Sequence, residues 1–205
     1  MAYGQRRRRG RGWGALFALL VASGCASIPK GQYGVTDIDW VGVEEMSEEA
    51  IEACLVTRER EQSTLRLGLG AGKCGQPPFD ASPPKIGLWT WPWVEWPLWD
   101  PSIFDLDRER IERWYRARGF YDARVKGVRT YTDGHAVTEP TDCDPEKSSC
   151  KVQVAVQVDE GKPVMVSDVR IETSGGGLST DVLRGVEKQL SVERGQRWDE
   201  YGYEQ

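Results

Sequence analysis

Residues Phe104–Val125 read FDLDRERIERWYRARGFYDARV and hold the clearest helix signal of the chain, followed directly by a strand signal. Three apolar residues recur at the i, i+3, i+4 spacing of one helical face: Ile111, Trp114 and Tyr115. Asp107 is expected to cap the first turn, and Leu106 is expected to pack on Ile111 as a hydrophobic staple. The stretch therefore predicts an amphipathic helix that ends at Gly119 and leads into a strand.

The charged residues of this helix are explained by ion pairs and by the helix dipole, without a catalytic role. Glu109 precedes Arg113 by four residues, which is the favourable orientation for an ion pair on a helix. Glu112 precedes Arg116 in the same way. Arg116 and Arg118 lie in the last turn, where cations oppose the negative end of the helix dipole. These carboxylates are therefore not candidates for catalysis.

The residues before this stretch predict a strand and a first helix. Val35–Val43 alternates in part, and it predicts a strand whose apolar face holds Ile38 and Trp40. Ser47 then starts a helix that is expected to end near residues 57–61. Four residues form the apolar stripe of this helix: Ala50, Ile51, Cys54 and Leu55.

Two runs after the second helix predict the strands of a long β-hairpin. Ala123–Tyr131 is rich in β-forming residues, and Lys151–Glu160 alternates between apolar and polar residues. Residues 132–149 are polar, contain turn signals and connect the two runs. Four valines share one face of the second run: Val152, Val154, Val156 and Val158.

A Gly- and Pro-rich insertion at residues 65–102 interrupts this pattern. Pro92 and Pro97 exclude a long helix or a central strand in its second half. Five tryptophans crowd the same part: Trp89, Trp91, Trp93, Trp96 and Trp99. They either cover one face of the sheet or of a helix, or they form an interfacial or partner-contacting patch, because the indole ring is amphipathic.

The first 25 residues resemble an export signal. Five arginines precede an apolar run at Trp13–Val21, which is too short to span a bilayer. Small residues at positions 22–24 lead to Cys25, in a pattern similar to a bacterial lipobox. That resemblance implies lipidation of Cys25 and retention at the outer membrane. A plain cleaved signal peptide is the alternative, and residues 26–34 follow as a polar tether.

Charge and cysteine content restrict the classes of partner and cofactor. The chain of 205 residues has a formal charge of −5, which becomes about −10 when the five leader arginines are removed. This acidity argues against nucleic acid as a partner. With Cys25 assigned to lipid, proximity favours disulfides Cys54–Cys74 and Cys143–Cys150, and the other pairings stay open. A single histidine and the absence of C-x₂-C spacing predict no metal site and no other cofactor.

No constellation of residues predicts an enzyme. Residues 68–75 read GLGAGKCG and lack both the first Gly and the Ser or Thr of a P-loop. Asp142, Asp144 and Glu146 resemble the start of a calcium loop, but the Gly at the sixth position and the closing Glu are absent. His135 has no recognisable nucleophile or acid partner. We therefore predict no catalytic residue.

Residues 165–205 repeat the opening pattern of the chain. Val164–Glu172 predicts a strand, and Ser179 or Thr180 starts a helix. The apolar face of that helix holds Val182, Leu183, Val186 and Leu190. The pattern stops before a second helix and a hairpin, so the sequence is expected to be the N-terminal part of a longer protein.

The order strand, helix, helix, strand, strand between residues 35 and 164 resembles a polypeptide-transport-associated (POTRA) domain. The residues that carry the resemblance are the Gly119-Phe120 break after the second helix and the Glu160-Gly161 exit from the last strand. Residues 165–205 resemble the first half of a second domain. The resemblance implies an α+β fold of tandem β-α-α-β-β domains, with helices on one face of a small mixed sheet and the second domain incomplete.

Tandem domains of this kind look like those of outer-membrane β-barrel assembly factors of the Bam or Tam type. The resemblance implies a periplasmic scaffold at the outer membrane, working with other subunits of an assembly complex. It would guide unfolded outer-membrane proteins by β-augmentation toward a C-terminal barrel absent from this sequence. Val35–Val43 or Ala123–Tyr131 would offer the sheet edge. A stand-alone outer-membrane lipoprotein, acting as an accessory docking or structural partner in the envelope, is the alternative. An envelope hydrolase, a third class, has no support in these residues.

Overall fold

The computed structural model describes residues 25–65, 72–80, 86–132, 135–137 and 150–203. The elements in chain order are β1 (Tyr33–Val41), α2 (Glu48–Glu52), β2 (Ser63–Leu65), β3 (Ile86–Trp89), α3 (Pro101–Ala117), β4 (Arg124–Thr132), β5 (His135–Val137), β6 (Cys150–Asp159), α4 (Thr180–Glu187) and α5 (Glu200–Tyr203).

The main sheet has four strands in the order β1-β6-β4-β5. Strand β6 pairs in parallel with β1 and antiparallel with β4, so it occupies the centre of the three longest strands. The short strand β5 adds antiparallel to the far end of β4, within the segment that the sequence predicts as a connection. The predicted mixed sheet, the β4–β6 hairpin and the α+β class are confirmed.

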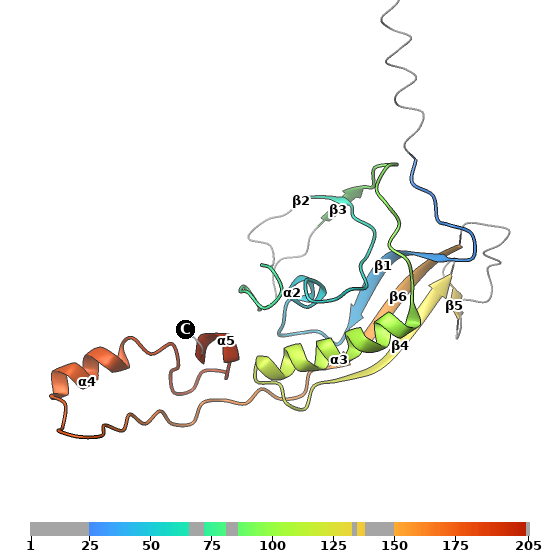
Figure 1. Ribbon diagram of the computed structural model, residues 1–205. Coiled ribbons are helices and arrows are strands. Elements are labelled where there is room, and N and C mark those ends of the chain that lie inside the picture. Colours follow the sequence, from blue (N-terminus) through green and yellow to red (C-terminus); the bar gives the residue numbers. More distant parts are fainter. Residues whose placement is uncertain (1–24, 66–71, 81–85, 133–134, 138–149, 204–205) are drawn as a thin grey trace, which may run out of the picture.

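The core lies on one face of this sheet. The four valines predicted to share a face of β6 are at most 4% exposed. They pack in one cluster with Ala50 and Ile51 of α2 and with Ile111 and Tyr115 of α3, so both helices cover the same face. Figure 1 shows α3 lying across the sheet. Each such aliphatic side chain contributes about 1.5–3 kcal/mol through burial.

Strand β1 departs from regular alternation because it contains a bulge. Its register with β6 shifts between Val35 and Asp37. Val35 and Ile38 are therefore both buried although they are three residues apart. Ile38 faces the core as predicted. Trp40 is only half-buried, and its indole N–H donates to Glu52 Oε1 of α2 at 2.8 Å.

Helix α3 begins seven residues earlier than the sequence predicts. Asp100 is the N-cap residue, and its side chain accepts a hydrogen bond from the Ser102 backbone N–H at 2.8 Å. Pro101 occupies the first helical position, where its missing N–H costs nothing. The predicted cap at Asp107 and the predicted staple at Leu106 are therefore wrong, and the Leu106 side chain is 54% exposed.

Asp107 instead is a buried carboxylate in the middle of α3. Its two oxygens accept hydrogen bonds from the backbone N–H groups of Val56, at 3.1 Å, and Thr57, at 2.8 Å. Arg110 donates to the same carboxylate. These bonds also explain why α2 ends at Glu52 rather than near residues 57–61, since the amides that would extend it are held by α3.

A second buried carboxylate closes the other end of the core. Glu160, just after β6, accepts a hydrogen bond from the Tyr115 hydroxyl at 2.9 Å and one from the Glu45 backbone N–H at 3.1 Å. The bonds join the end of the central strand to α3 and to the loop between β1 and α2. Burial, with the nearby Glu160 charge, raises the pKa of Tyr115 well above its ordinary value.

The end of α3 receives the C-terminal part of the chain. Gly119 has a φ of 87°, and a Cβ at this position would lie 2.6 Å from the Trp198 carbonyl oxygen. Arg118 was predicted to act on the helix dipole, but it is 4% exposed, stacks on the Phe79 ring at 3.8 Å and lies 3.8 Å from Asp199. Residues 195–203 therefore pack against the end of α3 and against Phe79.

The strand predicted at Val164–Glu172 is absent from the structure, which describes all of these residues. A strand needs a partner for its ladder of hydrogen bonds, and only an isolated bridge joins Met165 to Arg197. The helix predicted next is present as α4, with Ser179 as its N-cap. None of its residues is buried, and Figure 1 shows it at the end of a long arm clear of the sheet.

The insertion at residues 65–102 is more regular than predicted. Strands β2 and β3 pair antiparallel and form a small second sheet. A disulfide joins Cys54 and Cys74 across 20 residues of sequence, as the spacing predicts. Cys143 lies outside the described residues, so the Cys143–Cys150 pairing stays a prediction.

We expect Asp107→Ala to lower the free energy of unfolding at neutral pH by about 3 kcal/mol, because it leaves two buried amides without an acceptor. Burial alone would raise the pKa of Asp107, but the Thr57 and Val56 amides and Arg110 outweigh it and hold the pKa below its ordinary 3.8. The contribution is therefore present above that value and is lost as the pH falls below it.

Urea unfolding of the wild type and the variant measures this difference. The matched control is Asp105→Ala on the same helix, whose side chain is 73% exposed and which should change stability by about 0.5 kcal/mol at most. Equal losses in the two variants would contradict the role assigned to Asp107.

Candidate functional site

The outer edge of β4 is open over most of its length. Strand β4 pairs with β6 from Arg124 to Tyr131, but it pairs with β5 only from Thr130 to Thr132. Within the described part of the chain, no strand pairs with the outer side of residues 124–129. Unpaired backbone groups along a strand edge are a template for another strand.

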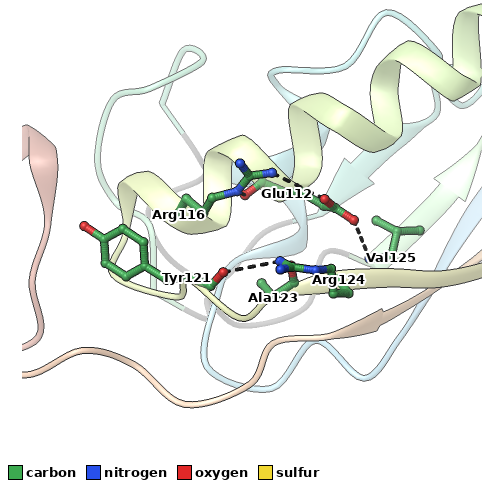
Figure 2. Close-up of polar contacts among 6 residues, drawn as sticks. All are labelled: Glu112, Arg116, Tyr121, Ala123, Arg124 and Val125. Atoms are coloured by element: carbon green, nitrogen blue, oxygen red, sulfur yellow. Dashed lines mark hydrogen bonds and ion pairs between the residues drawn. The ribbon is translucent and has the colours of Figure 1, made fainter.

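Side chains occupy the first backbone groups of this edge. Glu112 of α3 accepts a hydrogen bond from the Val125 backbone N–H at 3.3 Å, and it also forms an ion pair with Arg116 at 3.3 Å (Figure 2). Arg124 folds back and donates to the Ala123 carbonyl oxygen at 2.6 Å and to the Tyr121 carbonyl oxygen at 3.3 Å. At the start of the edge, the side chains of Glu112 and Arg124 thus occupy backbone hydrogen-bonding groups, and another strand could displace them.

A β-bulge and the charge of Lys126 limit strand pairing at the next residues of the edge. The register between β4 and β6 shifts between Val125 and Gly127. Lys126 lies in this bulge and forms an ion pair with Asp159 across the strands at 3.0 Å, which lowers the pKa of Asp159. A Cβ at Gly127 would meet nothing within 4 Å. Lysine and a bulge discourage indiscriminate pairing, and the open space at Gly127 leaves room for an approaching backbone.

The opposite edge of the sheet, on β1, is less accessible. The Trp-rich segment covers its start: the Val35 N–H donates to the Pro97 carbonyl oxygen at 2.8 Å, and the Trp99 N–H donates to that of Tyr33 at 2.9 Å. Further along, burial raises the pKa of Asp37 to about 7, together with a hydrogen bond from protonated Asp37 to Glu59 and the charges of Glu59 and Asp39. Of the two edges predicted from the sequence, β4 is therefore the more open one.

The five clustered tryptophans divide into two groups by exposure, and the predicted interfacial or partner-contacting role stays a prediction. Trp96 and Trp99 are half-buried: Trp96 lies under the Arg60 guanidinium at 3.8 Å, and Trp99 packs on Phe104 with ring centroids 5.3 Å apart. The remaining three are exposed together with two aliphatic neighbours. We call this group the tryptophan surface; it consists of Ile86, Leu88, Trp89, Trp91 and Trp93.

The other residues singled out in the sequence form no binding or catalytic site among the described residues. Cys25 is exposed at the start of the described chain. His135 lies in β5, and Asp142, Asp144 and Glu146 lie outside the described residues. Among the residues that the structure describes, no cluster of His, Cys, Asp and Glu could hold a metal ion. None of the described helices combines the length and the apolar character that a membrane crossing requires.

With β2, β3 and β5 set aside, the elements follow the β-α-α-β-β order that the sequence predicts, and two helices lie on one face of a mixed sheet. No family model and no curated protein sequence matches the chain. Among solved structures it is similar to POTRA domains 3–5 of BamA from Haemophilus influenzae, with 14% sequence identity and a TM-score of 0.39. That match covers 85% of this chain and 52% of the other, so the chain spans about half the length of that structure.

The raised pKa of Asp37 in β1 predicts that the stability of the protein depends on pH. Because the pKa of Asp37 is raised from 3.8 to about 7, the folded state binds a proton more tightly than the unfolded state. The stabilisation is complete below 3.8 and is lost as the pH rises through about 7. We expect Asp37→Asn to remove this decline and to exceed the wild type in stability above neutral pH.

Thermal unfolding across that pH range measures the effect. The exposed Asp122 offers the matched control, since Asp122→Asn leaves the acidic group on β1 unchanged and should keep the wild-type pH profile. A wild-type profile in Asp37→Asn would show that the pKa of Asp37 is not raised.

Proposed function

We propose that the protein is a periplasmic scaffold of an outer-membrane protein assembly factor, and that it binds unfolded β-barrel clients along the edge of β4. The observation that supports this most directly is the open backbone of residues 124–129 in a POTRA-like fold. Binding by strand addition requires no catalytic group, so the proposed role is that of a binding protein rather than an enzyme.

A client strand would replace the side chains that now occupy the edge. Its carbonyl oxygen would take the Val125 N–H from Glu112, which would remain paired with Arg116. The exchange leaves no buried polar group without a partner, so its cost is small. Main-chain hydrogen bonds supply affinity that is independent of sequence, which suits a scaffold with many clients.

The remaining parts of the proposal follow from the same role. Residues 165–205 would belong to a second domain of the same kind, and a membrane barrel beyond Gln205 would receive the clients. Other subunits of the assembly complex would be further partners at the periplasmic face of the outer membrane. A second candidate, an accessory outer-membrane lipoprotein without a barrel, is favoured by the exposed Cys25. The reading frame beyond Gln205 distinguishes the two candidates.

The proposal predicts that a peptide with the alternating sequence of a barrel strand slows amide hydrogen exchange in β4. We expect slower exchange at residues 124–129 and no change in β1, measured by mass spectrometry on the full chain. The control is the same peptide with its backbone N-methylated at alternate residues on one edge, which removes donors and leaves the side chains unchanged. Equal protection by both peptides would refute strand addition.

A pair of variants tests the guarding role of Glu112. Glu112→Ala frees the Val125 amide and should bind the peptide about three- to tenfold more tightly, since one competing hydrogen bond is removed. Glu109→Ala changes an exposed residue of the same helix and should leave the affinity unchanged. Weaker binding in Glu112→Ala alone would mean that Glu112 contacts the client instead of competing with it.

A further inference from the structure

The tryptophan surface carries an inference that does not depend on the scaffold role. The exposed fractions of its members are 52% for Ile86, 48% for Leu88, 53% for Trp89, 43% for Trp91 and 59% for Trp93. We propose that this surface binds the headgroup region of a lipid bilayer, beside Cys25, whose predicted lipidation would anchor the chain in the same membrane.

The arrangement of the indoles suits the boundary between lipid and water. Trp91 lies between its two neighbours, with ring centroids 5.9 Å from Trp89, edge to face, and 4.8 Å from Trp93, stacked. The Trp91 indole N–H donates to the Ser63 hydroxyl at 3.1 Å, at an exposed position. The rings therefore offer a continuous apolar area with a polar rim, which is the reason why tryptophan concentrates at membrane interfaces.

The surface is free of charge along the chain. Residues 86–94 read IGLWTWPWV and contain no Asp, Glu, Lys or Arg, and Glu95 is the first charged residue after them. Burying a charge among acyl chains is costly, so its absence favours insertion. The protein is acidic overall, so the attraction would come from apolar burial rather than from anionic lipids.

A rigid base holds the surface in place. Arg60 stacks on Trp96 and donates a hydrogen bond to the Val94 carbonyl oxygen at 2.9 Å. Strand β3, which carries Ile86, Leu88 and Trp89, pairs with β2. Because the apolar side chains are already presented in the folded protein, binding would not have to order a loose segment.

The position of the N-terminal segment, together with the predicted lipidation of Cys25, favours a membrane as the occupant. The Ala26 backbone N–H donates to the Pro92 carbonyl oxygen at 2.8 Å, so the residue after Cys25 is held at Pro92, which lies between Trp91 and Trp93 in the sequence. Figure 1 shows this first described segment, in blue, running beside the loop that carries β3. A lipid attached to Cys25 would enter the bilayer at the tryptophan surface.

Hydrogen exchange on the full chain tests the proposal with two kinds of vesicle: phosphatidylcholine alone, and phosphatidylethanolamine with phosphatidylglycerol. We expect exchange at residues 86–94 to slow about tenfold with both, since the binding is apolar. Exchange in α4, which exposes Val182 but also carries Asp181, Arg184 and Glu187, should not change. Equal slowing in α4 would indicate unspecific adsorption and would overturn the proposal, as would unchanged exchange at residues 86–94.

Matched triple variants separate this surface from the leader, which stays attached in every sample. Trp89→Ser, Trp91→Ser and Trp93→Ser together should abolish the local slowing while vesicle flotation of the full chain persists. The control combines Val169→Ser, Leu178→Ser and Val182→Ser, which are 38%, 47% and 48% exposed, and should behave as the wild type. Unchanged exchange in α3 and β6 verifies that both variants fold. Slowing at residues 86–94 by a soluble barrel-strand peptide, but not by vesicles, would assign the surface to a protein partner instead.

Discussion

Pairing of β6 on both of its sides is the constraint on which the rest of this structure depends. Its four buried valines supply the floor of the core, and α2 and α3 can pack only against that face. Because β6 is central, β1 and β4 must be the edges of the long-stranded part of the sheet. The place where another strand could bind is therefore a consequence of the same residues that stabilise the fold.

Two buried carboxylates convert this packing into one defined arrangement. Asp107 holds the turn after α2 through two backbone amides, and Glu160 ties the end of β6 to Tyr115 and to the loop before α2. Apolar contacts alone would allow the helices to slide along the valine face, since burial has no direction. Hydrogen bonds from fixed amides do have a direction, and they set the position of α3 along the sheet.

The features that sequence reasoning recovers are those with a local period. The valines of β6 and the Ile111, Trp114, Tyr115 face of α3 repeat at spacings that only one secondary structure satisfies. The features it misses depend on distant partners. Asp107 looks like a cap until Val56 and Thr57 are known to lie beside it, and the bulge after Val35 is defined only by its register with β6. The open edge at β4 likewise follows from strand order, which no short motif encodes.

The insertion links the two candidate surfaces. Its Pro97–Trp99 end covers the start of β1, which leaves β4 as the accessible edge, while its Trp89–Trp93 part is exposed.

The contact at Gly119 has a consequence for the path of the chain, because a side chain at this position has no room beside the Trp198 carbonyl oxygen. The Val164 N–H donates to the Gly119 carbonyl oxygen at 2.9 Å just beyond it. The chain beyond β6 is therefore fastened at Val164 to the end of α3, and this contact sets the direction in which it continues.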